Sequence, residues 1–66
     1  MGRTKEALVQ LRRAWALVKD PEIAAHVGEV LWVSGKQDEA RRYFDEARRL
    51  DPDNRALQRA VEKFGL

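Results

Sequence analysis

Residues 21–54 read PEIAAHVGEVLWVSGKQDEARRYFDEARRLDPDN, and this stretch decides the fold. It contains two runs in which apolar residues recur at three- and four-residue steps, the spacing of one helix face. Asp20 and Pro21 open the first run as a capping residue followed by proline at the first helical position. Gly35 separates the two runs and Pro52 follows the second, so each helix has a stop signal. The sequence therefore predicts two short antiparallel helices joined by a glycine turn.

Small residues mark where the two predicted helices should meet. The first apolar stripe comprises Ala24, Val27, Gly28 and Leu31, and the second comprises Ala40, Phe44, Ala47 and Leu50. A glycine inside a helix costs about 1 kcal/mol relative to alanine, so Gly28 needs a packing reason. Ala40 also lacks bulk, and we expect the helices to approach most closely at these two residues. Leu31 and Phe44 should fill the space beyond them.

This pattern of small and large residues resembles the tetratricopeptide repeat (TPR), a helix–turn–helix unit of about 34 residues. The positions that match the family pattern are Gly28, Ala40, Phe44, Ala47 and Pro52. Val27 and Leu31 are apolar substitutes, whereas Ala24 stands where the family usually has tryptophan. The resemblance implies an all-α fold of TPR-like antiparallel helical hairpins that stack into a right-handed α-solenoid. It also implies a non-enzymatic scaffold that binds other proteins.

The segments on either side of this repeat resemble parts of further repeats. Residues 2–17 match the second helix of the repeat one repeat length earlier, with Ala7 in the place of Ala40. We predict a single domain of about one and a half repeats over residues 1–66: the second helix of a preceding repeat at 2–19, a complete repeat at 21–54 and a C-terminal capping helix at 55–66. Gly65 followed by Leu66 is typical of a helix C-terminus with an apolar residue beyond it. We expect the chain to be the C-terminal fragment of a longer repeat protein.

Composition restricts the classes of function. With 66 residues the chain is small for a self-sufficient core, because chains below about 70–80 residues rarely gain more than ~3–5 kcal/mol from core burial. It has no cysteine for a disulfide or a thiolate site, and its charges are mixed in sign, with a formal net charge of +2. No apolar run is long enough to span a membrane, and no signal peptide is visible. We therefore expect a cytoplasmic protein without a membrane segment.

One face of the helix that begins at Pro21 is the predicted binding groove. In tetratricopeptide proteins the first helix of each repeat lines a concave groove, so the resemblance places a partner-binding surface on this face. The residues of this predicted groove are Glu22, Ala25, His26, Glu29, Trp32 and Val33. Trp32 has two interpretations: a groove anchor, since tryptophan is a frequent hot spot, or lateral packing against the last helix. Ala25 and Glu29 do not suit the capture of a terminal carboxylate, for which family members use lysine and asparagine.

The first helix carries more apolar surface than its later copy. The residues of this predicted self-association face are Leu8, Leu11, Trp15 and Val18. One interpretation is packing against the helix that begins at Pro21. The other is docking of a missing helix or a second chain, because repeat proteins bury apolar faces against neighbours and about three repeats are normally needed for stability. We expect the isolated chain to self-associate through this face, as a two-fold homodimer or by exchange of the first helix.

Other chemistry finds little support in the sequence. His26 lies within one turn of Glu22 and Glu29, but a metal site needs more ligands than these. The chain has one histidine, one serine and no glycine-rich phosphate loop, so we expect no catalytic residues, no metal and no cofactor. Arginine pairs suggest nucleic-acid binding, but interspersed acids favour a solvated face of ion pairs. These pairs are at 12–13, 41–42 and 48–49.

The predicted function is that of a protein–protein interaction scaffold, which binds a peptide or a partner helix in a groove of the tetratricopeptide type. Two alternatives remain open: a nucleic-acid-binding helical domain that uses its arginine-rich faces, and a purely structural end-cap of a longer solenoid. A steep fall of affinity with salt would identify the first alternative. A groove filled by the chain's own side chains would identify the second.

Overall fold

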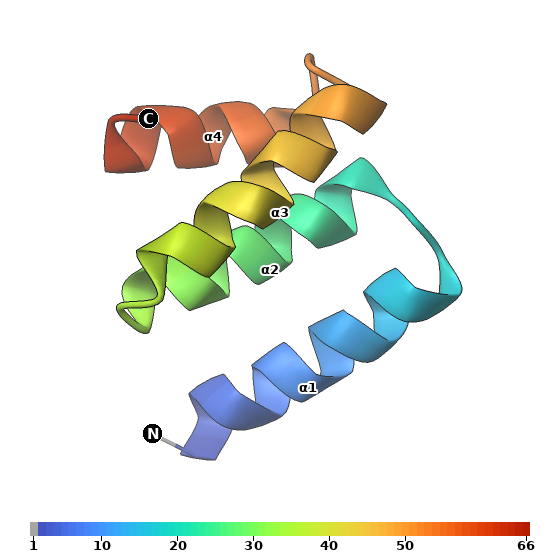
Figure 1. The fold of residues 1–66 in the computed structure, drawn as a ribbon, viewed down its shortest axis with the longest axis vertical. Coiled ribbons are helices and arrows are strands. Elements are labelled where there is room, and N and C mark those ends of the chain that lie inside the picture. Colours follow the sequence, from blue (N-terminus) through green and yellow to red (C-terminus); the bar gives the residue numbers. More distant parts are fainter. Residues whose placement is uncertain (1) are drawn as a thin grey trace.

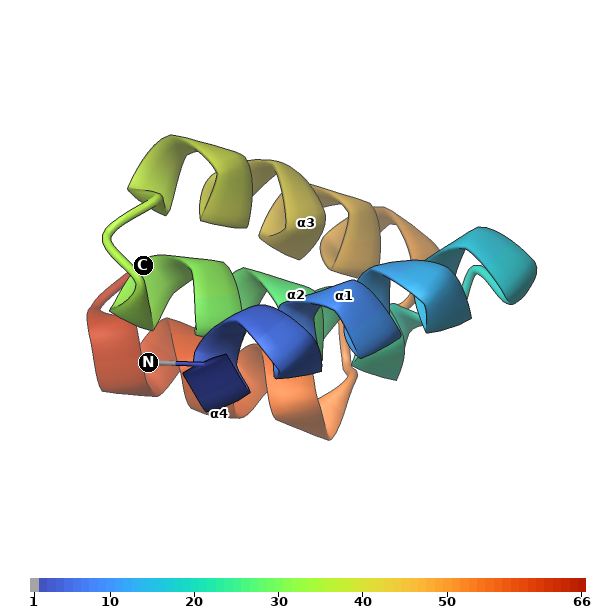
Figure 2. The same cartoon turned by 90° about the horizontal axis from the view of Figure 1, so that it is seen from below.

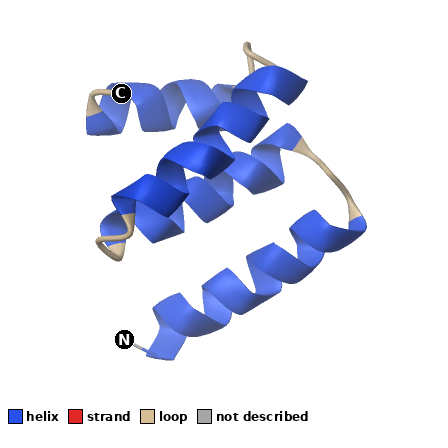
Figure 3. Ribbon diagram, in the orientation of Figure 1, coloured by secondary structure: helices blue, strands red, loops and turns tan. Residues whose placement is uncertain are grey.

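Helices joined by short loops make up the part of the chain that the structure describes. The computed structural model describes the backbone of residues 2–66 and the side chains of residues 5–66. Its elements are α1 (Gly2–Leu17), α2 (Pro21–Val33), α3 (Gln37–Leu50) and α4 (Arg55–Phe64) (Figure 1). Residues 2–66 form no strand, and Figure 3 shows loops only between and after the helices. The predicted all-α fold of antiparallel helical hairpins is confirmed.

The central element is α2. It packs against α1, α3 and α4, and α3 also contacts α4. α2 and α3 form an antiparallel hairpin, and α1 and α4 lie on opposite sides of it (Figure 1). In Figure 2, α3 forms an upper layer, with the other helices beneath it. Because three helices pack around α2, their arrangement determines how much of the surface of α2 remains open to solvent. None of the helices formed by residues 2–66 is long and apolar enough to cross a membrane.

Side-chain caps begin α2 and α4. Asp20 has an extended backbone, and its Oδ1 accepts a hydrogen bond of 2.8 Å from the backbone N–H of Glu22. Pro21 then occupies the first helical position, where its missing N–H leaves no partner unsatisfied. The side chain of Asn54 accepts a 3.1 Å hydrogen bond from the backbone N–H of Leu57 at the start of α4. The start predicted at Asp20 and Pro21 is therefore confirmed.

Glycines in the left-handed region end the same two helices. Gly35 has a φ of 88° and Gly65 a φ of 69°, which side chains rarely adopt. The backbone N–H after each glycine donates to a carbonyl in the last turn: Lys36 to Leu31 at 2.9 Å, and Leu66 to Val61 at 3.0 Å. This arrangement is the long hydrogen bond of a Schellman motif. Leu66 also packs against the core, as expected for an apolar residue that follows the glycine at a helix C-terminus.

Alanine makes up much of the core. The buried apolar residues are Ala24, Ala25, Val27, Leu31, Ala40, Phe44, Ala47, Ala56, Leu57 and Ala60. Leu31, Phe44 and Leu57 are its largest side chains, and each is at most 2% exposed. A methyl side chain lets two helix backbones approach closely, so the few large residues can fill the gaps between them. The helices are thus held by close contact over small residues.

Gly28 makes room for the ring of Phe44. A Cβ atom placed on Gly28 would lie 2.6 Å from Cε1 of Phe44 and 2.9 Å from its Cζ. Ala40 is fully buried, but the nearest atoms to such a Cβ belong to Phe44. That the helices approach most closely at Gly28 and Ala40 stays a prediction, and the group that fills the space beside Gly28 is the ring of Phe44. The reason is that an aromatic ring, placed one turn after Ala40, needs more room than a methyl group and takes the space that the glycine leaves.

Candidate functional site

The predicted groove on α2 is partly covered by α4. Ala25 is 1% exposed and belongs to the core, so its predicted accessibility to a peptide is wrong. Trp32 stacks on Phe64 of α4, with ring centroids 5.2 Å apart and ring planes inclined by 20°. The indole is half-buried, so Trp32 packs laterally against the last helix as the second interpretation proposed, and Arg41 Cζ lies 5.7 Å from the centroid of the same ring. Its role as a groove anchor stays a prediction. Ala25 and Trp32 are covered in this way because α4 lies along the stripe of α2 that carries them.

A hollow remains open between α2 and α4. It is lined by His26, Glu29, Val30, Val33, Ala56, Arg59, Ala60 and Lys63. Three of the predicted groove residues, His26, Glu29 and Val33, are therefore brought together with residues of α4. Glu22 is exposed near the start of α2 but does not line this hollow, and Trp32 lines another one at the end of α4.

Apolar and charged groups share the α2/α4 hollow. Val33 is 64% exposed, so its side chain presents apolar surface in the hollow. Lys63 Nζ lies 3.4 Å from Glu29 Oε1 across the hollow, and both side chains are exposed enough for water to weaken the pair. Arg59 is exposed beside them and forms no ion pair among the described side chains. The hollow therefore offers an apolar patch next to a free cation.

The predicted self-association face is not an open strip. Leu8, Leu11 and Trp15 are half-buried and pack against the core of this chain, as the first interpretation of that face proposed. Only Val18 is clearly open, at 58% exposure. The prediction of a continuous exposed strip is therefore wrong for three of its four residues, because α1 folds onto α2. Leu17, which was not part of that face, is 85% exposed.

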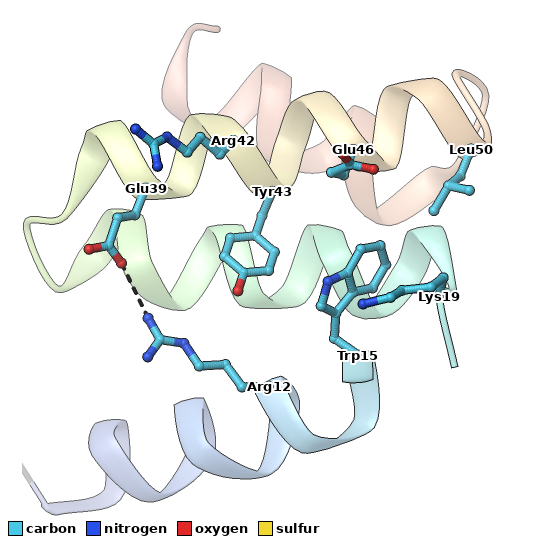
Figure 4. A pocket seen from close by; sticks show the side chains of 8 residues that line it. All are labelled: Arg12, Trp15, Lys19, Glu39, Arg42, Tyr43, Glu46 and Leu50. Carbon is cyan, nitrogen blue, oxygen red and sulfur yellow. Dashed lines mark hydrogen bonds and ion pairs between the residues drawn. The ribbon is translucent and has the colours of Figure 1, made fainter. Parts of the chain in front are cut away.

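A further hollow lies between α1 and α3, and it was not predicted from the sequence. Its lining residues are Arg12, Trp15, Lys19, Glu39, Arg42, Tyr43, Glu46 and Leu50, and its volume is about 580 Å³ (Figure 4). Trp15 and Tyr43 meet edge to face, with centroids 6.2 Å apart and planes at 70°. Tyr43 was the signal in the sequence that could have indicated this hollow. It directly precedes Phe44, so it lies on a different face of the same helix from the buried Phe44.

Three of the six arginines in the three sequence pairs lie beside acids. Arg48 lies 3.6 Å from Asp45, Arg49 lies 3.2 Å from Glu46, and Arg12 lies 3.2 Å from Glu39. All these side chains are largely exposed, and such pairs contribute about 0.2–1 kcal/mol each. Arg48 and Arg49 on α3 therefore lie beside carboxylates of the same helix, as expected for a solvated face.

The helical repeat identifies the family. Residues 21–54, which form the capped α2–α3 hairpin, match the family described as tetratricopeptide repeat. This chain is a tetratricopeptide repeat protein. No curated protein and no solved structure matches it. Tetratricopeptide repeats generally mediate protein–protein interactions, and the family is typically a non-enzymatic interaction scaffold.

Proposed function

We propose that this chain binds a peptide or a partner helix in the hollow between α2 and α4. The observation that supports this most is the convergence of His26, Glu29 and Val33 with the exposed Arg59 in one hollow. Protein interfaces commonly combine an apolar centre with a charged rim. Here Val33 supplies apolar surface and Arg59 supplies a cation at the edge.

The chemistry of this hollow favours a segment with a small apolar side chain next to a carboxylate. Val30, Ala56 and Ala60 give a floor of short apolar side chains, which leaves room for an aliphatic group. Arg59 can pair with a carboxylate of the segment. The exposed pair between Glu29 and Lys63 can open to accept further polar groups, since it is weakly held.

Peptide selection followed by NMR tests this proposal. Peptides selected from a random library on the immobilised chain are titrated into ¹⁵N-labelled protein. We expect the largest shift changes at His26, Glu29, Val33 and Arg59. Val33→Asp should weaken binding about tenfold or more, whereas Leu17→Asp, at an exposed apolar position on α1, should leave it unchanged. Selected peptides that leave the α2/α4 hollow unperturbed would overturn the proposal.

A structural end-cap is a second candidate, and one observation favours it. Phe64 of α4 stacks on Trp32, so the chain's own side chain fills part of the predicted groove. The same selection separates the two candidates, because an end-cap alone would yield no specific peptide. Replacing Phe64 by alanine would then lower stability without creating or removing any binding.

A further inference from the structure

α1 and α3 contact each other through side chains and not through close packing of their backbones. This leaves a hollow open between the two helices. α1 packs on α2, and its links to α3 are the Trp15–Tyr43 contact and the ion pair between Arg12 and Glu39. Figure 4 shows Tyr43 and Leu50 extending from α3, and Trp15 from α1, into the space between them. Its volume of about 580 Å³ falls in the range of about 300–1,000 Å³ found for ligand sites.

One end of this α1/α3 hollow is apolar. Trp15 is half-buried and Leu50 is 46% exposed, although Leu50 is a large aliphatic residue at the end of α3. Lys19 Nζ lies 4.5 Å from the centroid of the Trp15 ring, which holds the ammonium group at the rim. A large apolar side chain could therefore lie against the indole and Leu50 while its neighbours reach a cation.

The charges that remain free in the hollow are positive. The two carboxylates of the lining already have partners, since Glu39 pairs with Arg12 and Glu46 pairs with Arg49, each at 3.2 Å. The other two charged groups are Lys19 and Arg42, and both are exposed. Among the described side chains neither of these cations forms an ion pair. An occupant with negative charge on both sides of an apolar group would complement this arrangement.

We propose that the α1/α3 hollow is a second binding surface, which takes an acidic segment of a partner protein. In that segment a large apolar or aromatic side chain lies against Trp15 and Leu50, and flanking carboxylates pair with Lys19 and Arg42. This surface shares no residue with the hollow between α2 and α4. A chain that binds at both places could join two segments, and the proposal holds whether or not the α2/α4 hollow binds peptide.

A fluorescent nine-residue peptide with one central tryptophan and flanking glutamates is the probe. Its dissociation constant is measured by fluorescence anisotropy with the full chain, at low and at physiological salt. We expect Lys19→Glu combined with Arg42→Glu to weaken binding at least tenfold. The matched control is Lys36→Glu combined with Arg55→Glu, an exposed lysine and an exposed arginine that line neither hollow, which should leave the constant within twofold.

A charge-swapped peptide completes the test. The same probe with lysines in place of the glutamates should bind poorly to the parent chain and better to the variant with two glutamates. This rescue would show that the charge-reversed variant is folded and that the contact is direct. Equal weakening by the control variant with Lys36→Glu and Arg55→Glu, or binding of each peptide that is unchanged by the reversals at Lys19 and Arg42, would overturn the proposal. Binding of a glutamate peptide without the tryptophan at the same strength would overturn the apolar part of it.

Discussion

The ring of Phe44 lies against the bare Cα of Gly28. Cε1, Cδ1 and Cζ of the ring would all be within 2.9 Å of a Cβ atom on that residue. Phe44 is 2% exposed, so its ring has little room in which to move. The two residues come from different helices of the hairpin, and their contact therefore sets how closely α2 and α3 can approach.

Gly28→Ala is expected to destabilise the chain, even though alanine is the better helix former. Alanine gains about 1 kcal/mol in helix propensity. Overpacking in a buried contact costs about 1–3 kcal/mol, and here the added methyl group meets a buried ring. Urea denaturation of the variant should show a net loss of stability. Phe44→Leu in the same chain should recover part of that loss, and a more stable single variant would contradict the prediction.

Ala40→Leu and Ala7→Leu are the same change at equivalent positions of two helices. Ala40 is fully buried between α2 and α3, whereas Ala7 is exposed on α1. We expect a loss of about 1–3 kcal/mol for Ala40→Leu and a change within about 0.5 kcal/mol for Ala7→Leu. Melting curves of both variants check this. Equal melting temperatures for Ala40→Leu and the parent would mean that the hairpin is packed differently.

Gly35→Ala tests the turn between α2 and α3. Nothing lies within 4 Å of the position where its Cβ would be, so the added methyl group meets no neighbour. The φ of 88° is nonetheless unfavourable for a side chain, and we expect a loss of about 1–2 kcal/mol in the free energy of unfolding. Gly35→Asn is the control, because asparagine tolerates this region better and should lose less. Identical losses for the two variants would point to a cause other than backbone strain.

Self-association through α1 stays a prediction, and the structure changes which residue should test it. Trp15 packs against the core, so Trp15→Glu would disturb the fold as well as any interface. Val18 is 58% exposed and lies after the end of α1, so Val18→Glu leaves the core intact. We expect sedimentation equilibrium to show reversible association at micromolar concentrations that Val18→Glu weakens. If sedimentation equilibrium shows a monomer at every concentration, the prediction of self-association is wrong.

The features that could be predicted from the sequence are those that neighbours along the chain determine. The cap at Asp20 and the glycine stop at Gly35 depend on residues within one or two turns, and both were found. The spacing of Ala40 and Phe44 likewise defined a helix face that is buried. Local patterns were therefore enough to give the hairpin and its ends.

The errors concern contacts between segments far apart in the chain. Ala25 was assigned to an open groove, but whether it is exposed depends on where α4 lies, and α4 begins at Arg55. Trp15 was likewise assigned to an open face, because the sequence of one helix does not determine how α1 packs on α2. The α1/α3 hollow depends on how α1 is placed relative to α3, so its combination of Trp15 and Tyr43 could not be predicted from either helix alone.

The alanine-rich core has a consequence for how temperature acts on the chain. Alanine supplies six of the ten buried apolar residues. Each buries less apolar surface than a leucine would, and the heat capacity of unfolding rises with the apolar surface exposed. We therefore expect a heat-capacity change per residue below the usual value of about 12–15 cal/mol/K. A smaller change flattens the dependence of stability on temperature, so the chain should lose little stability on cooling and melt over a broad range on heating.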